Sequence, residues 1–395
     1  MRVRDLKGEG RRGVVALPHG VLTPFDILPP PPLQIAYTLL LQCPRLRQLT
    51  RLTRLASLNM TDGPLAELTH LTVDQPPDQP PGGPQWLEAL LPRLAALRTL
   101  TGTAPLDMST FARVCAGLLC PRLVSLQVVV GPSSQDSHQP RDVLFRVRPG
   151  IRTLSATVQE YVRRVTVEGP NLERLSLSFP RACLELTLRC PELVSLQLDA
   201  SSYRAPVALG PMPRLRRLGL DMTSGGKLAL DPHVRSLIRS AAVANLRALS
   251  LGCIDAGTVD VLQAHWPPGL VALDLTMDEL LAHEEELVIR VPPRLRRLTV
   301  RGHRWATLGL VELLHPKDVN GPVALEEVCI EAGEAGPVKV RGPQHFPYWR
   351  RVECPVGTPV DQLQETLPGM EVSTYSTGMR GGGRGGRGRG RRWRG

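Results

Sequence analysis

The stretch Pro170-Asn-Leu172-Glu-Arg-Leu175-Ser-Leu177 returns 21 residues later as Pro191-Glu-Leu193-Val-Ser-Leu196-Gln-Leu198. The shared phrase is a proline followed by apolar residues at the second, fifth and seventh positions after it. Further copies begin at Pro121, Pro213, Pro268 and Pro293. Such repetition is typical of an array in which each unit buries its apolar face against its neighbours and a long surface stays open. An open surface of this kind favours binding over catalysis.

The spacing of the phrase predicts one strand in each repeat. The last two apolar residues of Leu-x-x-Leu-x-Leu are two apart, so they lie on the same face of a strand. Counted from the first leucine of each phrase, the steps from Leu172 to Leu325 are 21, 22, 31, 24, 25 and 30 residues. We therefore predict an α/β repeat solenoid, an arc of parallel strands with one coil for each phrase.

The linkers predict an outer face that mixes helix, strand and irregular segments. Helices are expected over 110–118, 231–243, 258–264 and 360–367, because capping residues open these stretches and proline follows the cap in two of them. Between Ile151 and Leu198, in contrast, apolar triplets recur every ten or eleven residues. Ten residues cannot hold a strand, a helix and two turns, so a second strand is expected on the outer face there.

From about residue 41 to residue 372 the chain resembles the leucine-rich-repeat family, whose pattern is Leu-x-x-Leu-x-Leu-x-x-(Asn or Cys)-x-Leu. Cys43, Cys120 and Cys190 stand directly before a proline, as in the irregular repeats of F-box-associated leucine-rich proteins. The Asn/Cys position departs from the pattern, as Ile254 and His303 show. The resemblance implies an arc that binds its partner on the inner face, with irregular curvature.

The chain is expected to have three parts. Residues 1–40 form a basic and proline-rich leader that caps the array, residues 41–372 form the solenoid, and residues 373–395 form an Arg/Gly-rich tail. Seven of the 48 basic residues lie in the last sixteen positions, which leaves 41 basic and 37 acidic residues elsewhere. The chain before the tail is thus close to neutral. The composition of the tail predicts disorder, because glycine and arginine offer no apolar surface to bury.

The tail resembles the Arg-Gly-Gly boxes of RNA-associated proteins. Guanidinium groups contact phosphates and stack on bases, and an indole adds a stacking surface, so RNA or another polyanion is the expected partner. The residues assigned to this contact are Arg380, Arg384, Arg387, Arg389, Arg391, Arg392, Trp393 and Arg394. The alternative is an incidental tail, because 44 of the 48 basic residues are arginine and a general bias toward arginine would also produce it.

A protein partner is expected on the inner face, at the positions that flank the middle leucine of each triplet. These positions carry small polar residues and several arginines, which suits an acidic partner. The candidate contact residues are Arg174, Arg217, Arg297, Gln127, Gln197 and Asp274. A merely solvated sheet face would show the same residues, and it is the favoured alternative because no aromatic anchor occurs among them.

No catalytic or metal-binding pattern survives inspection, so the sequence predicts a protein that is not an enzyme and needs no cofactor, metal or small-molecule substrate. His283-Glu-Glu-Glu lacks the second histidine of a zinc-protease helix, and Gly225-Gly-Lys227 lacks the Ser or Thr of a phosphate-binding loop. The eight cysteines have no Cys-x-x-Cys spacing. They are expected to be buried thiols in a reducing compartment, the cytoplasm or the nucleus.

The predicted function is a non-catalytic scaffold for protein–protein interaction, with a tail that contacts RNA. No apolar run approaches the roughly 20 residues of a membrane helix, so no membrane contact is expected. The alternative is a substrate receptor of a ubiquitin ligase. The stretch from Leu17 to Leu28 faintly resembles the opening of an F-box, although Pro24 interrupts the helix that an F-box would need.

Overall fold

The structure is a computed structural model. It describes residues 37–41, 48–52, 55–60, 67–73, 85–131, 141–180, 183–200, 207–222, 244–254, 256–277, 286–302, 307–316, 321–332, 334–360, 363, 365, 367 and 369–375. The stretch from Leu17 to Leu28, the helix predicted over 231–243 and the tail residues from Arg380 to Arg394 lie outside the described residues, and the helix predicted over 360–367 lies partly outside them.

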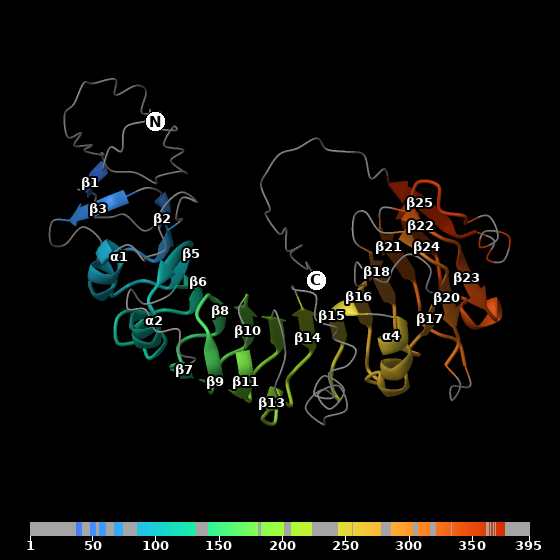
Figure 1. Ribbon diagram of the computed structural model, residues 1–395, viewed down its shortest axis with the longest axis horizontal. Coiled ribbons are helices and arrows are strands. Elements are labelled where there is room, and N and C mark those ends of the chain that lie inside the picture. The colour runs from blue at the N-terminus through green and yellow to red at the C-terminus, as the bar shows by residue number, and fades with distance from the viewer. Residues whose placement is uncertain are drawn as a thin grey trace, which may run out of the picture.

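Fourteen strands of the described part form one parallel sheet that follows an open arc (Figure 1). Neighbours in the sheet follow one another along the chain, with one strand from each coil. The strands are β2 (Gln48–Leu52), β4 (His70–Val73), β5 (Thr99–Leu106), β6 (Ser125–Val130), β8 (Thr153–Val158), β10 (Arg174–Phe179), β12 (Ser195–Ala200), β14 (Arg217–Met222), β15 (Ala248–Ile254), β16 (Ala272–Met277), β18 (Arg297–Arg301), β21 (Glu327–Glu331), β24 (Arg351–Pro355) and β25 (Glu371–Tyr375). The predicted repeat solenoid of parallel strands is confirmed.

The leucine triplets hold these strands in register. Leu196 of β12 is aligned with Leu175 of β10 on one side and with Leu218 of β14 on the other. The same ladder continues through Leu249 to Leu273. All five side chains are at most 2% exposed. Because each leucine packs between its equivalents in the coils before and after it, the core is one continuous apolar column inside the arc.

The proline of the phrase lies in the turn that leads into each strand. The N–H of Leu193 donates to the carbonyl of Cys190 at 3.1 Å, so Pro191 and the residue after it are the central residues of a β-turn. Proline suits the first of these two positions because its fixed φ matches that turn. The coil at Leu215 repeats the contact, with its N–H 3.1 Å from the carbonyl of Met212.

The outer face of the middle coils carries a second parallel sheet. It contains β7 (Arg141–Arg146), β9 (Val162–Glu168), β11 (Cys183–Arg189) and β13 (Val207–Leu209). The second strand that was predicted between Ile151 and Leu198 is therefore confirmed. The side chains of Val165 and Leu188 in this sheet are buried in the core that it shares with the large sheet. The C-terminal coils have a similar three-stranded outer sheet, of β17 (Leu287–Arg290), β20 (Val311–Leu314) and β23 (Val338–Arg341).

Helix is scarce in the described residues. Besides α1 (Gln85–Leu90), two predicted helices are present as α2 (Met108–Cys115) and α4 (Ala256–Leu262), and each begins two residues earlier than predicted. Asp107 explains the shift for α2, because its side chain accepts hydrogen bonds from the backbone N–H groups of Ser109 and Thr110. The remaining elements are β1 (Tyr37–Leu41), β3 (Leu55–Met60), β19 (Thr307–Leu308), β22 (Glu334–Ala335) and the 3₁₀ turns at Leu91–Arg93, Gln263–His265 and Pro343–His345.

Cysteines that precede a phrase proline are buried, as predicted. The thiol of Cys120 donates to the carbonyl of Leu91 at 3.5 Å, and the thiol of Cys190 donates to the carbonyl of Val167 at 3.7 Å. Burial raises the pKa of Cys120 to about 12 and that of Cys190 to about 11. Both thiols therefore stay protonated near neutral pH, and each links its turn to the preceding coil. Cys43 lies outside the described residues.

Candidate functional site

The inner face of the large sheet carries mostly polar side chains, interrupted by a few small residues. In β10, for example, Arg174, Ser176 and Ser178 alternate with the buried Leu175 and Leu177 and are turned away from the core. Because successive strands are in register, each inward position of one strand lies beside the same position of the next. Three rows of side chains therefore run across the strands.

A shallow hollow with a volume of about 190 Å³ lies on this face between β12 and β18. Its floor is formed by small residues, among them Gly219, Ala248 and Ala272. Arg217 and Arg297 stand on either side of the two alanines in the first row, because Arg217 is aligned with Ala248, Ala248 with Ala272, and Ala272 with Arg297. The hollow exists because two short side chains separate two long ones.

The structure brings four of the six predicted inner-face residues together. Gln197, Arg217, Asp274 and Arg297 all line the hollow. Arg174 is exposed on β10, one strand outside it, where it is aligned with Ser195. Gln127 is exposed on β6 and lies apart from the group, because β8 and β10 separate β6 from β12.

Sequence reasoning missed the third inward row, which carries much of the acidic charge. Its members include Asp199 and Asp221, aligned with each other on β12 and β14, and Glu331 on β21. They follow the last apolar residue of the triplet. Simple extension of the strand alternation by two residues would have found them.

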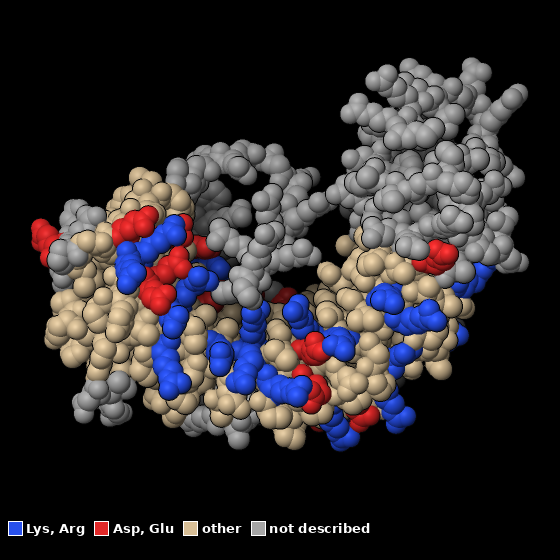
Figure 2. All heavy atoms as spheres, turned by 180° about the vertical axis from the view of Figure 1, so that it is seen from behind, with Lys and Arg blue, Asp and Glu red and all other residues tan. Residues whose placement is uncertain are grey.

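The charges on the middle of the inner face are unequally compensated. Arg174 and Arg217 are exposed and form no ion pair with the described residues. Toward the C-terminal coils, in contrast, Arg297 Nε lies 2.7 Å from Glu327 Oε2, and Arg351 Nη1 lies 3.8 Å from Glu327 Oε1. Figure 2 shows basic side chains spread along one side of the arc, with acidic ones gathered mainly at its C-terminal end.

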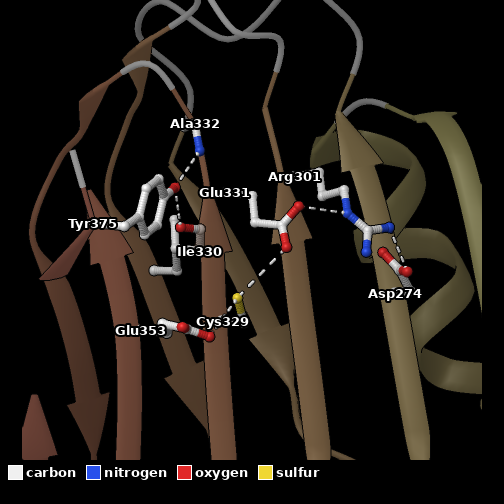
Figure 3. A network of polar contacts seen from close by, with 8 residues as sticks. All are labelled: Asp274, Arg301, Cys329, Ile330, Glu331, Ala332, Glu353 and Tyr375. Atoms are coloured by element: carbon white, nitrogen blue, oxygen red, sulfur yellow. Dashed lines mark hydrogen bonds and ion pairs between the residues drawn. The ribbon is translucent and has the colours of Figure 1, made fainter. Parts of the chain in front are cut away.

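A network of polar contacts crosses five strands at the C-terminal end of the inner face (Figure 3). Arg301 lies between Asp274 and Glu331: its Nη1 is 2.5 Å from Asp274 Oδ2, and its Nε is 2.9 Å from Glu331 Oε2. The thiol of Cys329 bridges Glu331 and Glu353 at 3.8 and 3.6 Å. These contacts tie neighbouring coils together through their side chains.

Tyr375 closes this network at the last strand. Its hydroxyl donates to the carbonyl of Ile330 at 2.7 Å and accepts from the N–H of Ala332 at 3.0 Å. Burial raises the pKa of Tyr375 to about 12 and that of Cys329 to about 12 as well. Both groups are neutral at physiological pH, so they serve here as hydrogen-bonding groups.

Two buried carboxylate oxygens on the inner face have no hydrogen-bond donor. Asp199 accepts from Ser178 Oγ at 3.0 Å through Oδ2, and Asp274 contacts Arg301 through Oδ2, while Oδ1 of each residue is without a partner. Burial raises the pKa of Asp274, and the positive charge of Arg301 opposes this effect. A buried acceptor without a donor costs free energy, which a hydrogen-bond donor added at either Oδ1 would recover.

The described residues contain no group of three or more His, Cys, Asp or Glu side chains placed to hold a metal ion. Nor does any helix among them have the length and apolar character that a membrane span requires. A scan against protein-family models gives no match, and a search of curated proteins gives none either.

Proposed function

We propose that this chain is a non-catalytic interaction scaffold of the leucine-rich-repeat type, which binds a protein partner on its inner face. The observation that carries the proposal is the hollow between β12 and β18, where the register of four coils gathers Arg217, Arg297 and Asp274 on one exposed polar surface. Repeat arcs of this kind provide extended concave surfaces for partners. The leucine-rich-repeat assignment is supported by the triplet, which supplies one inner strand per coil.

The mixed outer face is the second part of this assignment. Helix α2 packs against β7 and helix α4 packs against β17, next to coils whose outer segment is a strand. Linker length alone does not set the outer element, because the linker between β5 and β6 holds helix α2 while the longer linker between β18 and β21 holds strands β19 and β20. We propose that the solenoid is an α/β array in this sense, with the inner strand as its constant part.

Site-specific cross-linking tests the protein-binding proposal. A photoreactive amino acid replaces Ser250, which lies in the hollow, and in a matched control replaces Thr166, which is partly exposed on the outer sheet. The expected result is a discrete protein adduct from the Ser250 position that is absent from the Thr166 position. Adducts of the same proteins from both positions, or none from Ser250, would contradict binding on the inner face.

We further propose that the tail attaches the scaffold to RNA. Seven arginines between Arg380 and Arg394 would displace counterions from a single strand, so log K should fall with log salt at a slope of about −5. For the intact chain, the affinity for oligouridylate should therefore fall on the order of a thousandfold between 50 and 200 mM salt. Deletion of residues 380–395 should remove this salt-sensitive binding.

Replacing all seven tail arginines by lysine is the matched control for this experiment. The charge stays the same, so the salt slope should persist, while affinity should fall because lysine cannot stack on bases as guanidinium does. Filter binding at several salt concentrations measures both quantities. Retention that is unchanged after deletion would show that the tail is incidental.

A further inference from the structure

The hollow on the inner face has charges of opposite sign at two of its edges. Arg217 stands at the first row of β14, and Asp274 stands at the second row of β16. The two residues are two strands apart across the sheet and two residues apart along the strand direction, so their backbone positions lie about 12 Å from each other. Arg217 is exposed and unpaired in the described part of the chain, and Asp274 Oδ1 is buried without a donor. Arg217 can therefore donate to an acidic group of a ligand, and a donor that reaches Asp274 Oδ1 would satisfy a buried acceptor.

A nucleic acid does not suit this arrangement. A phosphodiester backbone carries negative charge along its whole length, so Asp274 in the hollow, and Asp199 and Asp221 in the row beside it, would repel it. Base binding to single strands also relies on aromatic stacking, and no aromatic residue lines the hollow. An acidic ligand would meet the same repulsion from the three aspartates, and a basic ligand would meet Arg217 and Arg297.

An extended peptide with both charges fits the spacing. Side chains on one face of an extended chain recur every second residue, so positions four apart lie about 13 Å from each other. The small residues of the floor, Ala248, Ala272 and Ser250, leave room for its backbone, and Ser250 and Gln197 offer hydrogen bonds to it. The floor thus accepts a main chain while the edges select its side chains.

We propose that the hollow between β12 and β18 binds an extended segment of the protein partner that presents an acidic side chain to Arg217 and, four residues away, a basic side chain to Asp274. This inference rests on the proposed scaffold function and specifies the chemistry of its partner. Arg297 takes a lesser part, because Glu327 already neutralises it at 2.7 Å. Asp274 is also paired, but its partner Arg301 is shared with Glu331, so two carboxylates compete for one guanidinium.

Short synthetic peptides test the proposal with the full-length chain. The probes share one sequence and differ only at two positions, as Glu-Thr-Ser-Thr-Lys, Glu-Thr-Ser-Thr-Glu and Lys-Thr-Ser-Thr-Lys between Gly-Ser flanks. Fluorescence anisotropy at low salt should rank the mixed peptide first. Arg217→Glu should weaken it by about tenfold, because an attraction becomes a repulsion, and Asp274→Asn should weaken it by about fivefold.

Arg113→Glu is the matched control, since Arg113 is an exposed arginine on α2. It removes the same charge and should leave all three affinities unchanged. The Arg217→Glu variant should in addition bind the Lys-Thr-Ser-Thr-Lys peptide more tightly than the parent does. A misfolded surface could not produce that gain, and equal melting temperatures of the variants provide a second check.

Several outcomes would overturn the inference. Mixed-peptide binding that is indifferent to both Arg217→Glu and Asp274→Asn would do so, as would a clear preference for either singly charged peptide. A loss of oligouridylate binding on Arg217→Glu would make the hollow a nucleic-acid surface instead. Failure of this inference differs from failure of the scaffold proposal, because inner-face cross-linking from Ser250 can succeed with a partner of other chemistry.

Discussion

Two carboxyl groups near the N-terminal end of the described solenoid share a hydrogen bond. Glu88 lies in α1 and Asp107 caps α2. The hydrogen bond to Asp107, together with burial, raises the pKa of Glu88 to about 7. Burial opposes the ionisation of Asp107, but hydrogen bonds from Glu88 and from the N–H groups of Ser109 and Thr110 outweigh it and hold the pKa of Asp107 well below its usual range. The pair shares one proton at mildly acid pH.

This pair predicts a pH-dependent stability with a definite sign. A carboxyl group whose pKa rises from 4.5 to about 7 on folding stabilises the fold fully below about pH 4.5, and the contribution is lost as the pH rises through about 7. Glu88→Gln keeps a donor for Asp107 at every pH. The melting temperature of the parent should therefore fall relative to that of the variant between about pH 4.5 and pH 7. Glu371→Gln, at an exposed site, is the control. Parallel plots of melting temperature against pH for the parent and for Glu88→Gln would contradict the predicted contribution of the Glu88–Asp107 hydrogen bond.

Two glycines in distant strands of the large sheet, β5 and β14, tolerate a side chain differently. A Cβ on Gly102 of β5 would lie 1.8 Å from the carbonyl oxygen of Val73 in β4, which is backbone. A Cβ on Gly219 of β14 would lie 1.8 Å from Oε1 of Gln197, which is the end of a flexible side chain. Gly102 therefore permits the close approach of two strands, while Gly219 leaves space for one amide.

Alanine substitution should separate these two roles. Gly102→Ala should lower the free energy of unfolding by about 1–3 kcal/mol, because the backbone of β4 must move. Gly219→Ala should change it by less than about 0.5 kcal/mol, because Gln197 can turn toward solvent. Urea denaturation measures both values. Equal losses would mean that the contact between β4 and β5 adapts more easily than its geometry indicates.

The whole molecule is a one-dimensional stack, so the effect of damage depends on where it falls. Leu196 lies in the middle of the array, between Leu175 and Leu218, and Val352 lies near its C-terminal end. Both side chains are at most 1% exposed. In a stack each coil contacts mainly its neighbours, and stability is the sum of coil and interface contributions.

Aspartate at these two positions should therefore unfold different parts of the chain. Leu196→Asp buries a charge without a partner and should cost at least about 4 kcal/mol, with loss of hydrogen-exchange protection on both sides of β12. Val352→Asp should remove hydrogen-exchange protection only from β21, β24 and β25. Val194→Asp is the control, because Val194 is 36% exposed and should leave protection unchanged. Loss of protection throughout the chain in the Val352 variant would show that the arc unfolds as one unit.

Local rules of the sequence account for the repeated architecture. The step of two between Leu196 and Leu198 predicts the inner strand, and the ten-residue spacing around Val165 and Leu188 predicts the outer one. Helix α2 begins two residues before the predicted start at Thr110, because Asp107 caps it. Capping depends on the geometry of one side chain, which a pattern of apolar residues does not contain.

The residue pattern specifies the coil, its turn and its buried face, because these depend on contacts within one repeat and on identical contacts with the next. The binding surface, in contrast, forms only once the coils are stacked. Ala248 and Ala272 become the floor of a hollow only when register places them between Arg217 and Arg297, which lie 80 residues apart in sequence. Linker lengths vary along the chain, so the pairing of strands, and not a fixed sequence spacing, sets which side chains share a surface.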